Sequence, residues 1–129
     1  MRKQTRHANP TNAELEILRV LWQRGPSTVR EVHDALASSR DTGYTTVLKL
    51  LQIMAEKGLV RRDESERAHV YRPAESQASS QRTLVGDMLD KVFGGSAEQL
   101  VMHALAARPT TPEELAAIRR MIDELEEAE

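Results

Sequence analysis

The chain has 129 residues and a mass of 14.5 kDa, which suits one compact domain or two very small ones and is too short for a multidomain enzyme. It contains no cysteine, which excludes disulfides, thiolate metal sites and cysteine nucleophiles. No apolar run approaches the ~20 residues of a membrane helix, and the first residues lack the apolar stretch of a signal peptide. We therefore expect a cytoplasmic protein with no membrane insertion.

Charge is divided unevenly along the chain. Residues 1–73 contain 13 Lys or Arg and 9 Asp or Glu, whereas residues 74–129 contain 5 and 11. This asymmetry is typical of a nucleic-acid-binding module joined to an acidic assembly module, and equally of a module with a solvated acidic tail. From charge alone the two interpretations stay open.

Two capping boxes predict the first two helices. Thr11 with Glu14 and Thr28 with Glu31 both have the S/T-x-x-E form, in which the two side chains satisfy orphan backbone donors at a helix start. Gly25 and Pro26 lie between the boxes and predict the end of the first helix. Each box is followed by apolar residues at helical spacing, which predict the buried stripes Leu15, Leu18, Leu21 and Trp22, then Val29, Val32 and Leu36.

A third helix and a hairpin complete the first half. The helix is expected from Gly43 or Tyr44 to Lys57, with Gly58 as its C-terminal stop. Its predicted buried face is Val47, Leu50, Leu51 and Met54, and its opposite face is Thr45, Lys49, Gln52 and Glu56. The β-prone runs 59–62 and 69–72, separated by the charged loop 63–68, then predict a hairpin. This order indicates a winged helix-turn-helix, whose third helix enters the major groove of DNA.

The second half predicts three more helices, at 75–93, at 96–107 and after Thr111 and Pro112. Leu100, Val101, Ala104 and Leu105 are expected to face inward from the middle one. So small a unit does not bury such stripes alone, and without disulfides or metal the simplest remedy is a homodimer. The alternative is that the stripes form an internal core only. The predicted dimer interface is Leu84, Met88, Val92, Phe93, Leu100, Val101, Leu105, Ile118, Met121, Ile122 and Leu125.

The expected fold class is therefore mostly α with a minor α+β component, arranged as an N-terminal winged helix-turn-helix followed by a three-helix dimerisation region. The expected divisions are a basic flexible arm (1–10), a winged-helix DNA-binding domain (11–74) and a helical dimerisation domain (75–129).

Several motifs in the chain occur together, in order, in one known family. They are Asn12 to Leu18 leading to Leu21 and Trp22, Pro26 to Val32, Tyr44 to Val47, Glu56 to Val60, Arg67 to Pro73, and Phe93 to Ser96. Over roughly Thr11 to Glu126 the chain resembles the BlaI/MecI/CopY family of bacterial transcriptional repressors, the penicillinase repressor-like proteins. The resemblance implies a homodimer that represses by binding double-stranded operator DNA at pseudo-palindromes of the TACA/TGTA type.

By that resemblance the recognition helix begins at Tyr44. Threonine hydroxyls and a lysine ammonium at a helix start can reach base edges and phosphates, and arginines of the wing and the arm suit phosphate contacts. The expected DNA-binding residues are Gly43, Tyr44, Thr45, Thr46, Lys49, Arg67, Arg6 and Arg30, with Arg2 and Lys3 as further arm cations. The acids Asp63, Glu64 and Glu66 oppose phosphate at the wing unless its arginines turn toward the duplex.

The resemblance also implies a mode of release. In the branch that regulates β-lactam resistance, a membrane-bound sensor protease signals and the repressor is cut in its dimerisation region, between an asparagine and a phenylalanine. His103 and Ala104 stand at the aligned position and are the candidate cleavage site, although the residue types differ. The copper-responsive branch uses cysteine pairs, which this chain lacks.

Two other classes of function compete with a repressor. The alternative to a repressor is a winged-helix protein–protein interaction module without specific DNA binding. An enzyme is disfavoured because there is no glycine-rich phosphate loop and no nucleophile–base pair, and no cofactor is expected. His33, His69 and His103 lack zinc-ligand spacing, so no metal site is expected, and His33 beside Asp34 is expected as a surface pair.

Overall fold

A computed structural model of the protein describes residues 9–128. Within that range the chain forms six helices and three short strands, so the expected class, mostly helical with a winged helix-turn-helix at the N-terminal side, is confirmed. Contacts divide the chain into a first unit that ends at Leu84 and a second unit that begins at Val85. The functional division at residues 74 and 75 stays a prediction. No helix among the described residues is long and apolar enough to cross a membrane.

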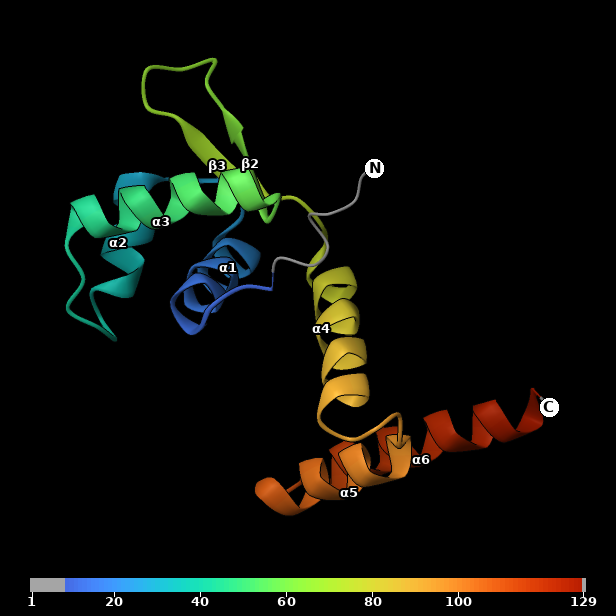
Figure 1. The fold of residues 1–129 in the computed structure, drawn as a ribbon. Coiled ribbons are helices and arrows are strands. Elements are labelled where there is room, and N and C mark those ends of the chain that lie inside the picture. The colour runs from blue at the N-terminus through green and yellow to red at the C-terminus, as the bar shows by residue number, and fades with distance from the viewer. Residues whose placement is uncertain (1–8, 129) are drawn as a thin grey trace, which may run out of the picture. The chain divides into compact units, whose positions relative to one another are not determined.

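Three helices form most of the first unit: α1 (Asn12–Arg24), α2 (Val29–Leu36) and α3 (Tyr44–Lys57) (Figure 1). Both predicted capping boxes are present, with Thr11 and Thr28 accepting from the backbone N–H groups three residues on. Helix α3 ends at Gly58, whose φ of 84° lies in the left-handed region that favours glycine. The capping boxes and the terminating glycines in the sequence therefore predicted where all three helices lie.

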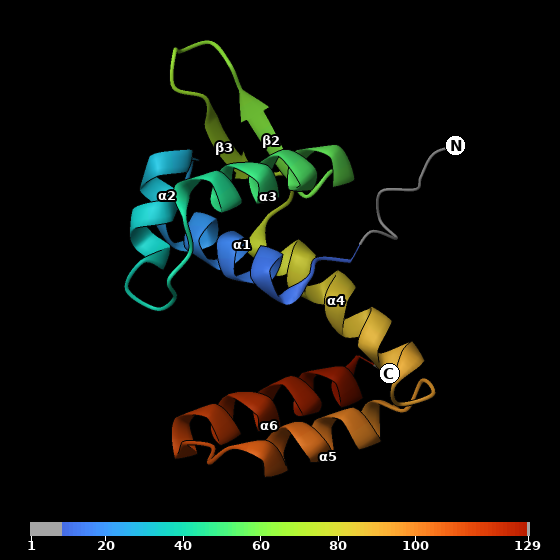
Figure 2. The ribbon, with the colours of Figure 1, turned by 60° about the vertical axis from the view of Figure 1, so that its left-hand side comes forward.

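A small antiparallel sheet packs with these helices. Its strands are β1 (Ser27–Thr28), β2 (Val60–Asp63) and β3 (Val70–Pro73), in the order β1-β3-β2. Tyr71 of β3 is opposite Ser27 on one side and Arg62 on the other. The predicted hairpin is confirmed, and both views show its loop extending beyond the helices (Figures 1 and 2). Strand β1 was not predicted, because two residues are too few to show a period.

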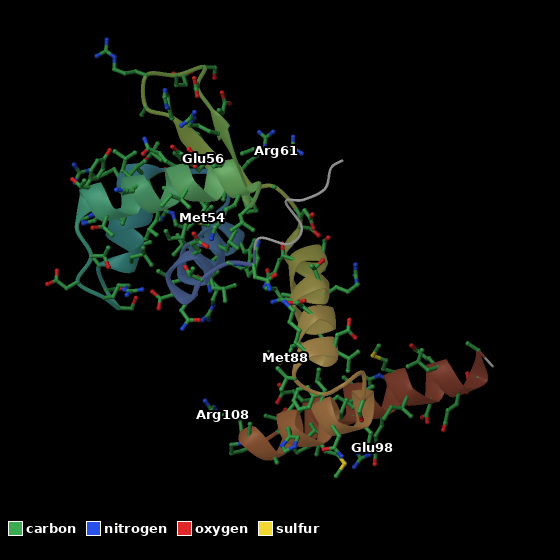
Figure 3. The ribbon with its side chains drawn as sticks, in the orientation of Figure 1. Met54, Glu56, Arg61, Met88, Glu98 and Arg108 are labelled. Carbon is green, nitrogen blue, oxygen red and sulfur yellow. The ribbon has the colours of Figure 1, made fainter. Side chains whose placement is uncertain are left out.

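The core of the first unit joins all three helices to the sheet. Side chains that are almost wholly buried come from the three helices and from β2 and β3, and they form one cluster: Ile17, Leu18, Leu21, Val29, Val32, Leu36, Val47, Leu51, Met54, Val60 and Tyr71. On α3, Met54 lies on the inner side while Glu56 is on the exposed side (Figure 3). Leu50, expected in the buried stripe, is only partly buried at its margin. Helix α3 is thus fixed along one face and open along the other.

The second unit contains the end of α4 (Gln77–Lys91), with α5 (Ala97–Ala107) and α6 (Pro112–Glu127). Helix α4 is shorter than the predicted 75–93 because the Ser76 hydroxyl accepts from the Ser79 N–H and caps its start. At its other end Gly94 and Gly95 both have positive φ. Ser96 and Thr111 each accept from the backbone N–H three residues on and cap α5 and α6, and the two helices run side by side in both views (Figures 1 and 2).

The apolar side chains of the second unit are not buried within one chain. No described residue of 85–128 is buried. The expectation that Val101, Ala104 and Leu105 face inward is wrong for the single chain, where all three are exposed. Helical periodicity identifies an apolar stripe but does not say what covers it.

Candidate nucleic-acid interface

The N-terminus of α3 differs from the other helix starts in having no side-chain cap. Gly43 is its N-cap residue and supplies no side-chain hydrogen bond, whereas α1, α2 and α6 begin with complete capping boxes. The first backbone N–H groups of α3 are therefore not satisfied by a cap, and such groups, with the positive end of the helix dipole, suit an anion. Tyr44, Thr45, Thr46 and Lys49 are all exposed around this end.

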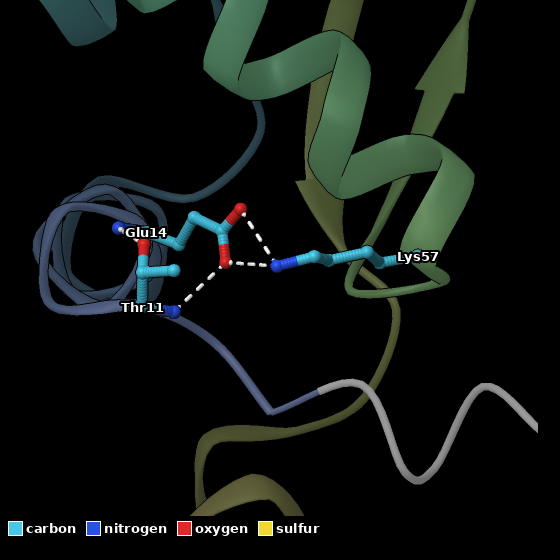
Figure 4. A network of polar contacts seen from close by, with 3 residues as sticks. All are labelled: Thr11, Glu14 and Lys57. Carbon is cyan, nitrogen blue, oxygen red and sulfur yellow. Dashed lines mark hydrogen bonds and ion pairs between the residues drawn. The ribbon is translucent and has the colours of Figure 1, made fainter.

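The opposite end of α3 is held to α1 by a charged contact. Lys57 Nζ donates to both carboxylate oxygens of Glu14, at 2.8 and 3.0 Å, and Glu14 Oε1 also accepts from the Thr11 N–H at 2.9 Å (Figure 4). Glu14 is 2% exposed, so its charge is compensated inside the fold. The capping box of α1 and the last turn of α3 are thereby one polar network.

A second tie fixes the turn that leads into α3. Arg40, in the segment between α2 and α3, donates to Glu16 of α1 at 2.7 Å. Both side chains are close to half exposed, so this pair contributes less than the buried one. The turn and the far end of α3 are nevertheless both tied to α1, which leaves the N-terminal half of α3 to meet a partner.

Ion pairs separate the cations of the first unit into two groups. Arg24, Arg40, Lys57 and Arg62 pair with carboxylates. Within residues 9–128, no carboxylate lies at ion-pair distance from the exposed cations of the second group, Arg19, Arg30, Lys49, Arg61, Arg67, Arg72 and Arg82. The predicted contacts Arg30, Lys49 and Arg67 all belong to this second group, and unpaired cations are those available to phosphates.

The wing neutralises part of its own negative charge. Arg62 Nε lies 2.7 Å from Glu64 Oε2, and its interactions with the Tyr71 side chain and then with Glu64 raise the pKa of the guanidinium. The Ser65 backbone N–H donates to Asp63 Oδ1 at 2.9 Å and lowers the pKa of that carboxyl below its ordinary value. Asp63 is therefore ionised at neutral pH, and Arg62 is engaged within the wing. Among the described wing arginines, Arg61, Arg67 and Arg72 have no carboxylate at ion-pair distance.

A concave surface between α3 and the wing was not among the residues predicted from the sequence. It is lined by Gln52, Ala55, Glu56 and Arg62. Gln52 follows Lys49 by three residues and Thr45 by seven, so helical spacing was the signal that could have included it. Arg62 gave no such signal, because its place beside α3 depends on the register of the hairpin.

The remaining predicted residues fall in different places. Arg30 is brought onto the Tyr44 ring, with its Cζ atom 4.8 Å from the ring centroid. His103 and Ala104 lie inside α5, both exposed, and the His103 ring stacks on Phe93 at 5.7 Å. Arg6, with Arg2 and Lys3, lies outside the described residues.

Histidines offer no metal site in the described part of the chain. The expected surface pair of His33 and Asp34 is confirmed, with His33 Nδ1 3.0 Å from Asp34 Oδ1. Within residues 9–128, no three His, Asp or Glu side chains gather in a way that could hold a metal ion.

Comparison with known proteins identifies the family. The family model described as penicillinase repressor matches residues 10–124. A protein named transcriptional regulator BlaI, from two strains of Mycobacterium tuberculosis, is 36% identical over 114 residues, covering 88% of this chain and 82% of its own. The penicillinase repressor of Bacillus licheniformis is 21% identical over 114 residues, covering 88% of this chain and 89% of its own.

A solved structure also resembles the chain. It is the solution structure of monomeric Bacillus licheniformis BlaI in complex with the blaP half-operator, with 24% identity, 54% of this chain and 85% of that chain covered, and a TM-score of 0.48. The family match covers most of the chain, and the Mycobacterium relative is similar over nearly all of it. The family is one of repressors and not of enzymes, and this chain belongs to the penicillinase repressor family.

Proposed function

We propose that this chain is a sequence-specific transcriptional repressor that binds double-stranded operator DNA as a homodimer. Helix α3 would lie in the major groove, and the wing would lie along the backbone. The operator would be a pseudo-palindrome of the TACA/TGTA type, bound in the bacterial cytoplasm. Membership of the penicillinase repressor family supports the regulatory role.

The observation that carries the proposal is the uncapped, exposed N-terminus of α3. Its backbone N–H groups suit phosphate oxygens, and the hydroxyls of Thr45 and Thr46 suit base edges or phosphates. Lys49 lies one turn further along the same exposed face and has no carboxylate partner within residues 9–128.

Exposed apolar side chains support the homodimer. Met88, Val92, Met121 and Leu125 are each more than half exposed, at 51%, 67%, 62% and 59%. Large apolar side chains exposed together mark interaction sites in soluble proteins. A second copy of the chain is the partner that fits a palindromic operator, with half-sites about 34 to 36 Å apart.

We extend the proposal to release by proteolysis after a signal from a membrane-bound sensor protease. The bond between His103 and Ala104 is the candidate cut site, by its aligned position alone. It lies in the middle of α5, so the helix must open locally before a protease can bind it in extended form. Mass spectrometry of the repressor from cells treated with a β-lactam would reveal the cut, and a chain that stays whole while the operon is induced would refute this route.

Operator binding is tested by fluorescence anisotropy. The purified protein is titrated into a labelled duplex with a TACA/TGTA inverted repeat and into a scrambled duplex of equal length, at two salt concentrations. We expect the palindrome to be preferred by at least ~10³, with affinity that falls steeply as salt rises.

The rival function gives the opposite result. A winged-helix protein–protein module without specific DNA binding would bind both duplexes equally and weakly. Unbiased selection from a random duplex pool then separates a different operator from no operator, because only a specific repressor enriches a common sequence.

A further inference from the structure

The N-termini of α2 and α3 meet at a contact between a cation and an aromatic ring. Arg30 is the second residue of α2 and Tyr44 is the first residue of α3. The Arg30 Cζ atom lies 4.8 Å from the centroid of the Tyr44 ring, well within the range of a cation–π interaction. Arg30 is exposed, Tyr44 is 40% exposed, and within residues 9–128 no carboxylate pairs with Arg30.

Helix α2 supplies two groups that contact the Tyr44 ring. The capping box of Thr28 and Glu31 fixes the first turn of α2, from which Arg30 projects. His33 follows Arg30 by three residues, and its ring meets that of Tyr44 edge-on, with centroids 6.3 Å apart and planes at 60°. Asp34 Oδ1 lies 3.0 Å from His33 Nδ1. The Tyr44 ring is therefore held by two side chains from the same helix face.

A guanidinium that lies over a ring keeps its own hydrogen-bond donors available. The five N–H donors of arginine lie in the plane of the group, whereas the ring attracts its positive charge electrostatically. An arginine held in this way has already lost much of its conformational freedom before a phosphate arrives. Helix α2 also belongs to the part of a helix-turn-helix that crosses the DNA backbone.

We propose that Tyr44 is a positioning residue that holds Arg30 ready for one backbone phosphate at the edge of the half-site. This inference rests on the proposed function and deepens it. Arg30 makes the phosphate contact, and Tyr44 acts through Arg30 and not through a base. The rival role for Tyr44, a direct contact with DNA, predicts a different pattern of mutant effects.

A double-mutant cycle separates the two roles. Arg30→Met, Tyr44→Leu and the double variant are titrated with the palindromic and scrambled duplexes over a salt series. The slope of log K against log salt is negative. We expect Arg30→Met to make it shallower by about 0.9 on both duplexes, since one phosphate contact is lost. We expect Tyr44→Leu alone to weaken binding about two- to fivefold with the slope unchanged, and to have no further effect when Arg30 is already Met.

Conservative variants control for the shape of the site. Tyr44→Phe keeps the ring, so its coupling to Arg30→Met in the cycle should match that of tyrosine, while Arg30→Lys keeps the charge and should keep the salt dependence of binding. A purely structural role for Tyr44 would lower the thermal unfolding temperature and would leave its effect intact in the Arg30→Met background. Additive effects of the two substitutions would overturn the inference.

The same titrations distinguish failure of this inference from failure of the proposed function. If the unmodified protein prefers the palindrome and the cycle is additive, only the positioning role is wrong. If the unmodified protein binds neither duplex, and selection enriches no sequence, the proposed function is wrong and the positioning role is wrong with it.

Discussion

Lys57 and Glu14 are 43 residues apart in the sequence, yet the lysine donates to both oxygens of the carboxylate, at 2.8 and 3.0 Å. The contact joins the last turn of α3 to the first turn of α1. Because only 3% of the Glu14 side chain is accessible, losing the lysine would leave a buried carboxylate without its counter-ion.

The first prediction is that Lys57→Met lowers the free energy of unfolding by about 2 kcal/mol, below the 3–5 kcal/mol of a fully buried pair because Lys57 is 28% exposed. Urea denaturation followed by fluorescence of Trp22, the chain's single tryptophan, measures it. Glu14→Gln should restore part of the loss in the Lys57→Met background. Arg40→Met, which breaks the exposed pair with Glu16, is the matched control and should cost less than about 1 kcal/mol. Equal losses at both sites would contradict the role of burial.

The second prediction concerns Lys49 on the open face of α3. If its ammonium contacts a phosphate, Lys49→Ala should make the negative slope of log K against log salt shallower by about 0.9 on every duplex. If it reaches a base, the variant should instead lose about 1–3 kcal/mol of discrimination between operator and scrambled DNA. Lys91→Ala is the charge-matched control, because Lys91 of α4 pairs with Asp87 at 3.2 Å. Unchanged operator affinity in Lys49→Ala would remove Lys49 from the interface.

The third prediction concerns assembly. Met88→Lys or Ile122→Lys should give monomers with weak operator binding, since a charge at an apolar contact is costly to bury. Sedimentation velocity measures the assembly state, and anisotropy measures the binding. Glu98→Lys, at an exposed polar position of α5 (Figure 3), is the control and should leave assembly intact. An intact dimer in Met88→Lys would exclude that position from the interface.

The fourth prediction concerns acid titration of the wing. Because the folded pKa of Asp63 is lowered, its ionised form contributes stability above the pKa of the unfolded chain, and this stability is lost as pH falls through the folded value. Ser65→Pro removes the donating N–H, so the Asp63 titration midpoint should rise. Ser65→Ala retains that N–H, the larger cause, and should keep most of the shift. Carboxyl carbon chemical shifts followed over pH measure both, and a midpoint unmoved in Ser65→Pro would refute the assignment.

Local sequence signals located most of the fold because they act over a few residues. The pairs Thr11 with Glu14 and Thr28 with Glu31 fix helix starts by contacts three residues apart, and Gly58 fixes a helix end by its own backbone. The exposed start of α3 at Tyr44 follows from the same rules. A feature that depends only on residues close together in the chain can therefore be predicted from the sequence alone.

Features that depend on distant parts of the chain were not predicted. Strand β1 exists because Ser27 pairs with Tyr71, and two residues carry no period. The contact of Arg30 with Tyr44 depends on how α2 and α3 pack against each other, and the spacing of these two residues in the sequence does not predict it. Val101 was expected to face inward but is exposed. An apolar stripe on a helix indicates that some surface covers it, but not whether that surface belongs to the same chain.

The lack of a buried residue in 85–128 has a consequence for the amount of protein a cell keeps. With the pairing proposed above, folding of this segment obeys mass action, so dilution favours the unpaired chain as a denaturant would. At low repressor concentration the operator would be unoccupied, and the unpaired chains would be susceptible to proteolysis. Repressor abundance and repressor lifetime would rise and fall together, which sharpens the response to any signal that removes part of the pool.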